Sequence, residues 1–276
     1  MHVADQAVHE VLEIAADRDQ LWRAWTDPAW LCGWLVERIG GAVEPGRALQ
    51  WRWDSLGLEL DLEVVASEPP ARLVLRGGRP GRPPRTQSVS LVKVAGGTRV
   101  ELTHEGFAAP VGNDHSEREG TAAGWRVMLR VLAHYLAGGG GRRRESASAI
   151  APVAVPLHTV GRLLFDPGER ARWLSDGAAL AAEGERFTLR EPDGASLSGR
   201  VIALAAPFEI ALSWEEIDGV LILRAIQVAP GGPVLAVAQA WSWSPERAAW
   251  GAARGTIERV LARLVSAAGG APGASA

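Results

Sequence analysis

The sequence is short of several residue types, and each shortage narrows what the protein can be. Its 276 residues include a single cysteine, Cys32, which excludes an intramolecular disulfide. This shortage favours a reducing compartment, so we expect the protein to be cytoplasmic. No motif that would activate a thiol surrounds Cys32, and a small buried apolar side chain is the favoured interpretation.

Long apolar runs and strong charge are also missing. No run approaches the roughly 18–20 apolar residues that cross a bilayer, so we expect no membrane span. The N-terminus carries Asp5, Glu10 and two histidines instead of an apolar segment, which argues against a signal peptide. A net charge of −3 gives no basic footprint for nucleic acid, so we expect no nucleic-acid partner.

Motifs for metals and cofactors are absent from the sequence as well. Cysteine, histidine and carboxylate residues do not recur at the spacing of metal ligands. We find no phosphate-cradling glycine loop, no G-x-S-x-G elbow and no convincing Ser/His/Asp set. We therefore expect neither a metal nor an organic cofactor, and the sequence leaves the oligomeric state open.

Tryptophan, by contrast, is abundant. The chain has 12 tryptophans against one tyrosine and four phenylalanines. A buried indole generally needs a partner for its N–H group, so each one constrains its surroundings. This composition predicts either a strongly aromatic core or the wall of a ligand cavity, and it does not decide between them.

A glycine-rich segment divides the chain almost in half. Four consecutive glycines at 138–141 cannot continue a helix, and the arginines and small residues after them show no apolar periodicity. We expect a first domain at 1–138, a linker at 139–150, a second domain at 151–268 and a flexible tail at 269–276.

The apolar pattern of the first half predicts one strand, two short helices, several strands and a long last helix. Asp17 is suited to cap the first helix. Leu49, Trp51 and Trp53 alternate with polar residues, as expected for a sheet with one solvent-exposed face. The expected strands are 8–14, 49–53, 58–64, 73–76, 88–94 and 99–103, and the expected helices are 17–27, 29–35 and 120–137.

The second half repeats this pattern. Asp27-Pro28 recurs 139 residues later, Val64-Val65 recurs as Val201-Ile202 at an offset of 137, and the apolar positions of the last helix recur at 132. Gly96-Gly97 also has a counterpart in Gly231-Gly232. Four matches in the same order predict a duplicated domain. An offset of 137 pairs His104 of the first copy with Trp241 of the second.

The order of these elements resembles the START and Bet v 1-like superfamily, also called SRPBCC. The first domain resembles its homologues of the heat-shock-protein ATPase activator, through the string Trp22 to Trp34, the string Thr103-His-Glu-Gly-Phe107 and the pair Gly124-Trp125. The second domain lacks the last two strings and resembles a degenerate copy. The resemblance implies an α+β fold with two helix-grip domains, each a curved antiparallel sheet wrapped around a long C-terminal helix. It also implies an apolar cavity between sheet and helix.

His104 is the residue that points most directly to chemistry. Alternation places it on one strand face with Val100 and Leu102, which must be the apolar, inward face. His104 could then act as an acid or base, hydrogen-bond a ligand oxygen, or bond neighbouring backbone at the strand end. The predicted ligand-binding residues are Trp30, Trp34, Trp51, Trp53, Leu102, His104, Phe107, Trp125, Met128, Trp214, Gln239, Trp241 and Trp243.

Three functions are compatible with the sequence. The favoured one is binding, and possible processing, of an elongated hydrophobic small molecule, such as a polyketide or polyene intermediate in a bacterial biosynthetic pathway. The alternatives are a polyketide cyclase or aromatase that uses His104 as acid or base, and a chaperone-regulating module that binds proteins. A single inward histidine supplies few groups for catalysis, which favours a binding function over an enzymatic one. We expect the two domains to cooperate on one ligand.

Overall fold

The computed structural model divides the chain into two compact units, Met1–Arg143 and Arg144–Ala276. The structure describes residues 7–107, 117–174, 180, 182–190, 196–227 and 232–269. Among these residues, no helix combines the length and the apolar character needed to cross a membrane.

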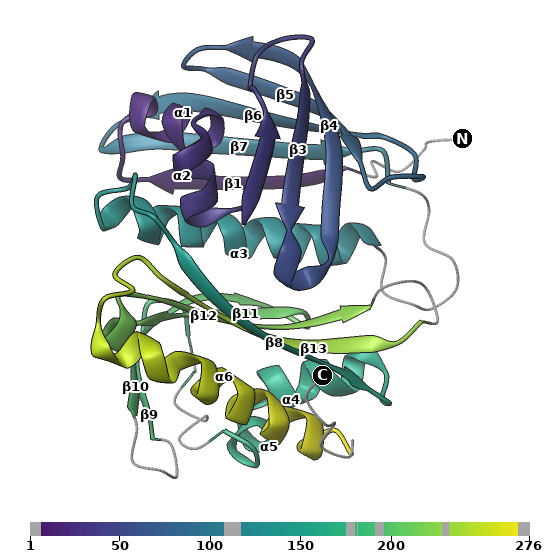
Figure 1. The fold of residues 1–276 in the computed structure, drawn as a ribbon, viewed down its shortest axis with the longest axis vertical. Helices are drawn as coiled ribbons and strands as arrows, with labels where there is room; N and C mark the ends of the chain where they lie inside the picture. The colour runs from purple at the N-terminus through teal and green to yellow at the C-terminus, as the bar shows by residue number, and fades with distance from the viewer. Residues whose placement is uncertain are drawn as a thin grey trace. The chain divides into compact units, whose positions relative to one another are not determined.

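The first unit is a seven-stranded antiparallel sheet with three helices, in the order β1-β7-β6-β5-β4-β3-β2 across the sheet (Figure 1). The long helix α3 packs along β1, and α1 packs near β6 and β7. The strands are β1 (Val8–Ile14), β2 (Arg38–Gly41), β3 (Ala48–Trp53), β4 (Leu58–Glu68), β5 (Arg72–Gly78), β6 (Arg85–Val94) and β7 (Gly97–Glu105), and the helices are α1 (Arg18–Thr26), α2 (Pro28–Trp34) and α3 (Glu117–Ala137). A short 3-10 turn, η1 (Asp54–Leu56), joins β3 to β4.

Local sequence explains where the first two helices begin. The Asp17 carboxylate accepts a hydrogen bond from the backbone N–H of Gln20, and the Gln20 side chain accepts one from the Asp17 N–H, which is a complete capping box. The Asp27 carboxylate caps α2 by accepting hydrogen bonds from the backbone N–H groups of Ala29 and Trp30, and Pro28 fills the first helical position, where no N–H is needed. The sequence therefore fixes both helix starts within a few residues.

The second unit has the same element order with one strand fewer. Its six-stranded antiparallel sheet has the order β8-β13-β12-β11-β10-β9, and α6 packs on β8 and β13. The strands are β8 (Glu145–Val153), β9 (Arg186–Arg190), β10 (Ser196–Ala205), β11 (Glu209–Trp214), β12 (Gly219–Gln227) and β13 (Val234–Ser242); the helices are α4 (Leu157–Phe165), α5 (Pro167–Ala171) and α6 (Ala248–Ala267), with a 3-10 turn η3 (Glu215–Ile217).

Matching contacts show that the two units are copies of one fold. The Trp34 indole N–H donates to the carbonyl of Ala24 at 2.8 Å, and the Trp173 indole N–H donates to the carbonyl of Leu163 at 2.9 Å. Asp166 caps α5 as Asp27 caps α2. The predicted duplication is confirmed, and so is the α+β fold with two helix-grip domains. The Gly231 part of one predicted match lies outside the described residues.

The segment predicted to be a flexible linker is ordered in the structure. Gly139 and Gly140 donate backbone hydrogen bonds to the carbonyls of Leu136 and Tyr135, which close the end of α3. Gly140 and Gly141 lie against the Trp30 ring so closely that an added Cβ would be 2.6 Å and 3.2 Å from its atoms. The two glycines have φ of +62°, a conformation that disfavours any other residue.

The second domain also begins earlier than predicted. Strand β8 starts at Glu145, inside the expected linker at 139–150. Residues 146–149 and 151 are all serine or alanine, and such short side chains give a weak strand signal. The linker boundaries are therefore corrected: the first unit runs to Arg143, and the next residue opens the second unit. The predicted tail lies outside the described residues from position 270 onward.

Candidate functional site in the first unit

Strand register places a row of side chains across the inner face of the first sheet, the face that α3 covers. Val8 pairs with His104, His104 pairs with Gln87, and Gln87 pairs with Leu75. Leu75 in turn pairs with Val64. Antiparallel partners share a face, so two polar side chains stand in the middle of an otherwise apolar row. Gln87 is 5% exposed and His104 is 7% exposed.

Hydrogen bonding fixes the tautomer of His104. The Trp125 indole Nε1, which can only donate, lies 3.2 Å from His104 Nδ1. Nδ1 must therefore be the acceptor, and the imidazole proton lies on Nε2. The Nε2 atom is buried and has no hydrogen-bond partner among the residues that the structure describes. His104 thus presents an unused N–H donor inside the fold.

The surroundings keep His104 neutral. Burial is the main cause that lowers its pKa to about 4, and the positive charge of Arg85 lowers it further, against the opposing charge of Glu117. Arg85 forms an ion pair with Glu117 and lies over the Phe107 ring at 4.3 Å. Although burial raises the pKa of Glu117, the hydrogen bond and charge of Arg85 hold it below its ordinary value.

A continuous line of aromatic rings leads away from His104. Its ring centroid lies 4.9 Å from that of Phe107 and 6.4 Å from that of Trp125. Trp125 lies 5.9 Å from Trp25, and Trp25 lies 5.0 Å from Trp34 in an edge-on arrangement. Rings from three helices, a strand and a loop are therefore in contact in one row, and such contacts between aromatic rings add stabilisation beyond simple burial.

Two further indole N–H groups on this side of the sheet lack partners. Trp25 Nε1 and Trp51 Nε1 are buried and form no hydrogen bond to any described residue. A buried polar group without a partner costs about 1–3 kcal/mol. Together with His104 Nε2, the first unit therefore contains three buried N–H donors that a bound molecule could satisfy.

Part of the inner face keeps contact with solvent. Trp53, Leu58 and Leu60 have the inward phase of β3 and β4, yet they are only half-buried. Trp53 lies edge-on to Trp51 at 6.3 Å, and its N–H donates to the carbonyl of Leu35. The inner face is therefore partly exposed at β3 and β4.

The other predicted residues of the first unit have different surroundings. Leu102 and Met128 are buried, on β7 and α3. Trp30 packs edge-on against Tyr135 at 6.5 Å and covers the glycine segment. The structure therefore brings Trp34, His104, Phe107 and Trp125 together, while it places Trp30 in a structural contact at the end of α3.

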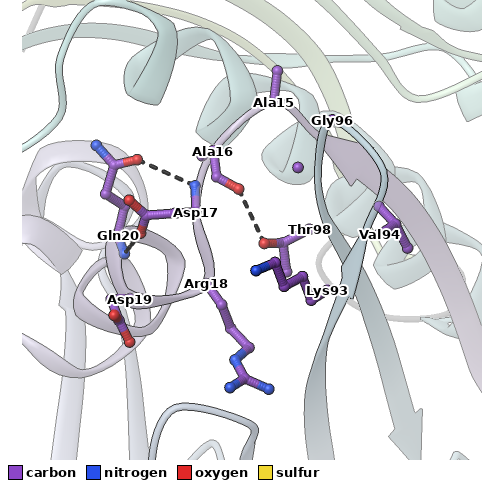
Figure 2. Close-up of a pocket in the computed structure, with 11 residues that line it drawn as sticks. Ala15, Ala16, Asp17, Arg18, Asp19, Gln20, Lys93, Val94, Gly96 and Thr98 are labelled. Carbon is purple, nitrogen blue, oxygen red and sulfur yellow. Dashed lines mark hydrogen bonds between the residues drawn. The ribbon is translucent and has the colours of Figure 1, made fainter.

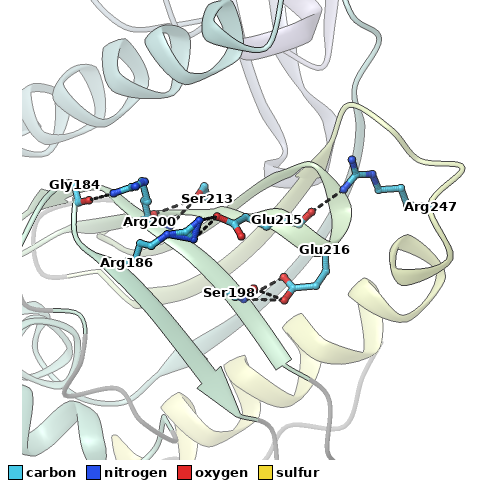
Figure 3. Close-up of polar contacts among 8 residues, drawn as sticks. All are labelled: Gly184, Arg186, Ser198, Arg200, Ser213, Glu215, Glu216 and Arg247. Carbon is cyan, nitrogen blue, oxygen red and sulfur yellow. Dashed lines mark hydrogen bonds and ion pairs between the residues drawn. The ribbon is translucent and has the colours of Figure 1, made fainter.

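Register identifies the inner face of the second sheet. Arg186, Ser198, Arg200 and Ser213 carry polar contacts on one face of β9 to β11, as Figure 3 shows. The opposite face of β9 and β10 is apolar and buried. That buried face continues through Val201, Leu212, Leu221, Ala240 and Ala147, which are successive partners across five strands.

This register corrects the predicted match between His104 and Trp241. Val64 and Val201 occupy equivalent positions beside matching strand irregularities, and counting across the pairs from there leads to His104 in one unit and Ala240 in the other. The offset is 136 at this strand because the loops before it differ in length. A shift of one residue moves a side chain to the opposite face.

The predicted residues of the second unit are consequently split between two faces. Trp214 has the inward phase, and its indole nitrogen has no partner among the described residues. Trp241 and Gln239 lie on the opposite face, where Arg144 covers the Trp241 ring at 4.1 Å and the Gln239 amide donates to Ser148. Trp243 follows the strand and donates its backbone N–H to Asp218.

A surface hollow of about 550 Å³ lies at the other end of β1 (Figure 2). It is lined by the turn before α1 and by the β6–β7 hairpin, with Arg18 and Lys93 as its cations. Asp17 and Gln20 already cap α1 there, and Thr98 donates to the carbonyl of Ala16. This hollow is separate from the polar row around His104.

Sequence reasoning missed several residues of the site. Gln87, Arg85 and Glu117 come from segments whose relation to His104 depends on strand pairing, which the sequence pattern does not give. Trp25 was not among the predicted site residues, although its spacing of four from Leu21 puts both on the apolar face of the helix. Among the residues described, no group of three or more histidine, cysteine or carboxylate side chains could hold a metal ion.

The fold and these contacts define the class of both units, the helix-grip fold of the START and Bet v 1-like proteins. The first unit also carries the sequence signature of one family in that class. Residues 15–137 match the family model described as Activator of Hsp90 ATPase homolog 1-like protein. No curated protein matches the chain by sequence.

Solved structures similar to the chain include single-unit and whole-chain matches. DynU16, a protein in the dynemicin biosynthetic locus, is 21% identical, with 96% of this chain and 97% of that chain covered and a TM-score of 0.44. A Mesorhizobium loti protein is 22% identical, covering 48% of this chain and 98% of its own, with a TM-score of 0.44. CalU16 from Micromonospora echinospora is 22% identical, with 47% of this chain and 75% of that chain covered and a TM-score of 0.40.

Proposed function

We propose that the first unit binds an elongated, flat, hydrophobic small molecule on the inner face of its sheet, and that a polyketide or a polyene is the class that fits. The observation that carries this proposal is a set of three buried N–H donors, on Trp25, Trp51 and His104, which have no partner among the residues that the structure describes. Native folds rarely leave such groups unsatisfied unless something else meets them.

The aromatic line supports a flat and conjugated molecule over a compact one. Rings at 5.0–6.4 Å from one another present faces and edges on which an unsaturated chain or fused ring can stack. The half-buried apolar side chains of β3 and β4 would contact the end of the molecule nearest to solvent. Mostly apolar walls with a few polar groups are typical of small-molecule sites.

Binding is favoured over acid–base catalysis by the state of His104. Its Nδ1 already accepts a hydrogen bond, and a pKa of about 4 makes the imidazole a weak base at neutral pH. The remaining function of the side chain is to donate from Nε2. A reaction guided by the shape of the site remains compatible with this arrangement, as in the cyclase alternative.

Native mass spectrometry tests the proposal on protein purified from the organism that makes it. We expect a retained small molecule in the full chain. Leu60→Arg places a charge on the half-buried inner face and should abolish retention, whereas Asp61→Arg, one residue away on the exposed outer face, should not. Circular dichroism would establish that both variants fold. A chain without ligand, or a ligand that survives Leu60→Arg, would contradict the proposal.

A further inference from the structure

The unsatisfied polar atoms on the inner face of the first unit have one property in common. Indole nitrogens can only donate, and the donor on Trp125 forces the His104 proton onto Nε2. Trp25, Trp51 and His104 therefore all offer N–H groups that lack an acceptor among the described residues. A molecule that satisfies this face must supply acceptors.

We infer, on the basis of the proposed function, that the inner face selects molecules with an uncharged carbonyl oxygen, such as a ketone or a quinone, and that the carbonyl accepts a hydrogen bond from His104 Nε2. This carbonyl lies at the His104 end of the bound molecule, and the rest of the molecule extends toward Trp51 and Trp53.

Charged and donor-rich groups fit this face less well. An amine would bring further donors to a site where three N–H groups already lack acceptors in the described part of the chain. A carboxylate would have to lose its water among aromatic side chains, and neutral N–H donors recover only part of that cost. The nearby cation, Arg85, is already paired with Glu117 and packed on Phe107. A carbonyl accepts without adding a charge or a donor.

The second unit lacks the histidine that this selection needs, although the buried Trp214 Nε1 there also has no partner among the described residues. Register places Ala240 where the first unit has His104, Leu221 where it has Gln87, and Gly219 where it has Arg85. The helix position equivalent to Trp125, at the offset of 132 that relates α3 to α6, is Ile257. Carbonyl selection should therefore be a property of the first unit alone.

A pair of probes that differ only in the carbonyl tests the inference. Fluorene and 9-fluorenone share one flat tricyclic skeleton, and 9-fluorenone carries a ketone at the central ring. We would titrate each into the full chain and follow tryptophan quenching and calorimetric heat. After correction for the partition of each probe into hydrocarbon, we expect 9-fluorenone to bind about tenfold more tightly, which corresponds to about 1.4 kcal/mol. Fluorene-9-carboxylate should bind more weakly than 9-fluorenone.

Variants assign the effect to one side chain. His104→Leu keeps a similar volume without a donor, so it should bind both neutral probes within threefold of each other. His9→Leu, on the exposed outer face of β1, should keep the preference. The carbonyl stretching band of bound 9-fluorenone should lie at lower frequency in the wild type than in His104→Leu, a readout that does not depend on small changes in stability.

Each remaining outcome has a distinct meaning. Equal corrected affinities for fluorene and 9-fluorenone in the wild type would overturn the carbonyl inference and leave the proposed function intact. A preference that persists in His104→Leu would overturn the role of His104. Failure of the full chain to bind either neutral probe would contradict the proposed function itself.

Discussion

The two units have the same framework and line it with different side chains. Across equivalent strands, the inner row of the first unit contains Val8, His104, Gln87, Leu75 and Val64. The corresponding row of the second unit contains alanine, alanine, leucine, leucine and valine. The polar middle of one row is apolar in the other.

This difference separates residues that maintain the fold from residues that serve a site. The indole-to-carbonyl bonds of Trp34 and Trp173, and the caps provided by Asp27 and Asp166, occur in both units. They hold the same pair of short helices in place in each unit. The His104 cluster occurs in the first unit alone, so the fold does not require it. A polar cluster that the fold can lack is a candidate for function.

The largest effect is expected from moving the histidine into the second unit. Ala240→His would place an imidazole on the inner face, where only a methyl group now fits and no partner of the Trp125 type exists. Overpacking and an unsatisfied polar group should together lower the free energy of unfolding by about 3 kcal/mol or more. Chemical denaturation measures this directly. Ser146→His, on an exposed position of β8, is the control and should change stability by less than about 0.5 kcal/mol.

A smaller effect is expected from the titration of His104 in the first unit. The unfolded chain binds a proton as pH falls through 6.5, whereas folded His104 stays neutral until about pH 4. The contribution of neutral His104 to the free energy of unfolding should therefore be fully present above pH 6.5. It should fall as pH decreases toward 4, by about 2 kcal/mol between pH 8 and pH 5. The measurement is the difference in unfolding free energy between wild type and His104→Gln at each pH. A difference that stays constant with pH would show that His104 is not held neutral.

Removal of the hydrogen bond that fixes the His104 tautomer should have an intermediate effect on the free energy of unfolding. Trp125→Phe removes the donor to His104 Nδ1 and leaves a buried acceptor unsatisfied, at a cost of about 1–3 kcal/mol beyond lost packing. The equivalent change in the second unit, Ile257→Leu, conserves volume and breaks no hydrogen bond, so less than about 1.5 kcal/mol is expected. Nitrogen NMR of His104 in Trp125→Phe should show a mixture of tautomers. A single unchanged tautomer would mean that another group sets it.

The smallest effect is expected when the second unit is removed. If the polar row of the first unit carries binding, residues 1–143 alone should bind 9-fluorenone within about threefold of the full chain, a difference of less than about 0.7 kcal/mol. Circular dichroism would first establish that the fragment folds. A loss of tenfold or more in a folded fragment would instead favour cooperation of both domains on one ligand.

Much of the fold could be predicted from the sequence because its signals are local. The strand Val8–Ile14 and the helix cap at Asp17 follow from alternation and from a capping residue, and both were placed correctly. Strand β2 was missed because Arg38–Gly41 has four residues, two of them glycine. This short strand depends on its pairing with β3, in which Ile39 lies opposite Trp51.

The candidate site was harder to predict because it depends on register between distant segments. The inward phase of His104 follows from its own strand and is confirmed by its burial and its contact with Trp125. Gln87 becomes its neighbour only once β6 pairs with β7. A constant offset along the sequence also failed at Trp241, because one residue of loop length reverses the face of the following strand.

The glycine segment has a consequence for how this chain can change over evolutionary time. Connecting segments on a protein surface generally tolerate insertions and deletions. Here three of the four glycines, at 139, 140 and 141, have φ of +106°, +62° and +62°, and two lie under the Trp30 ring. An added or deleted residue would displace that ring or pull Arg142 from the Tyr135 hydroxyl that donates to its carbonyl. A stretch of simple sequence is thus held to one length by its three-dimensional contacts.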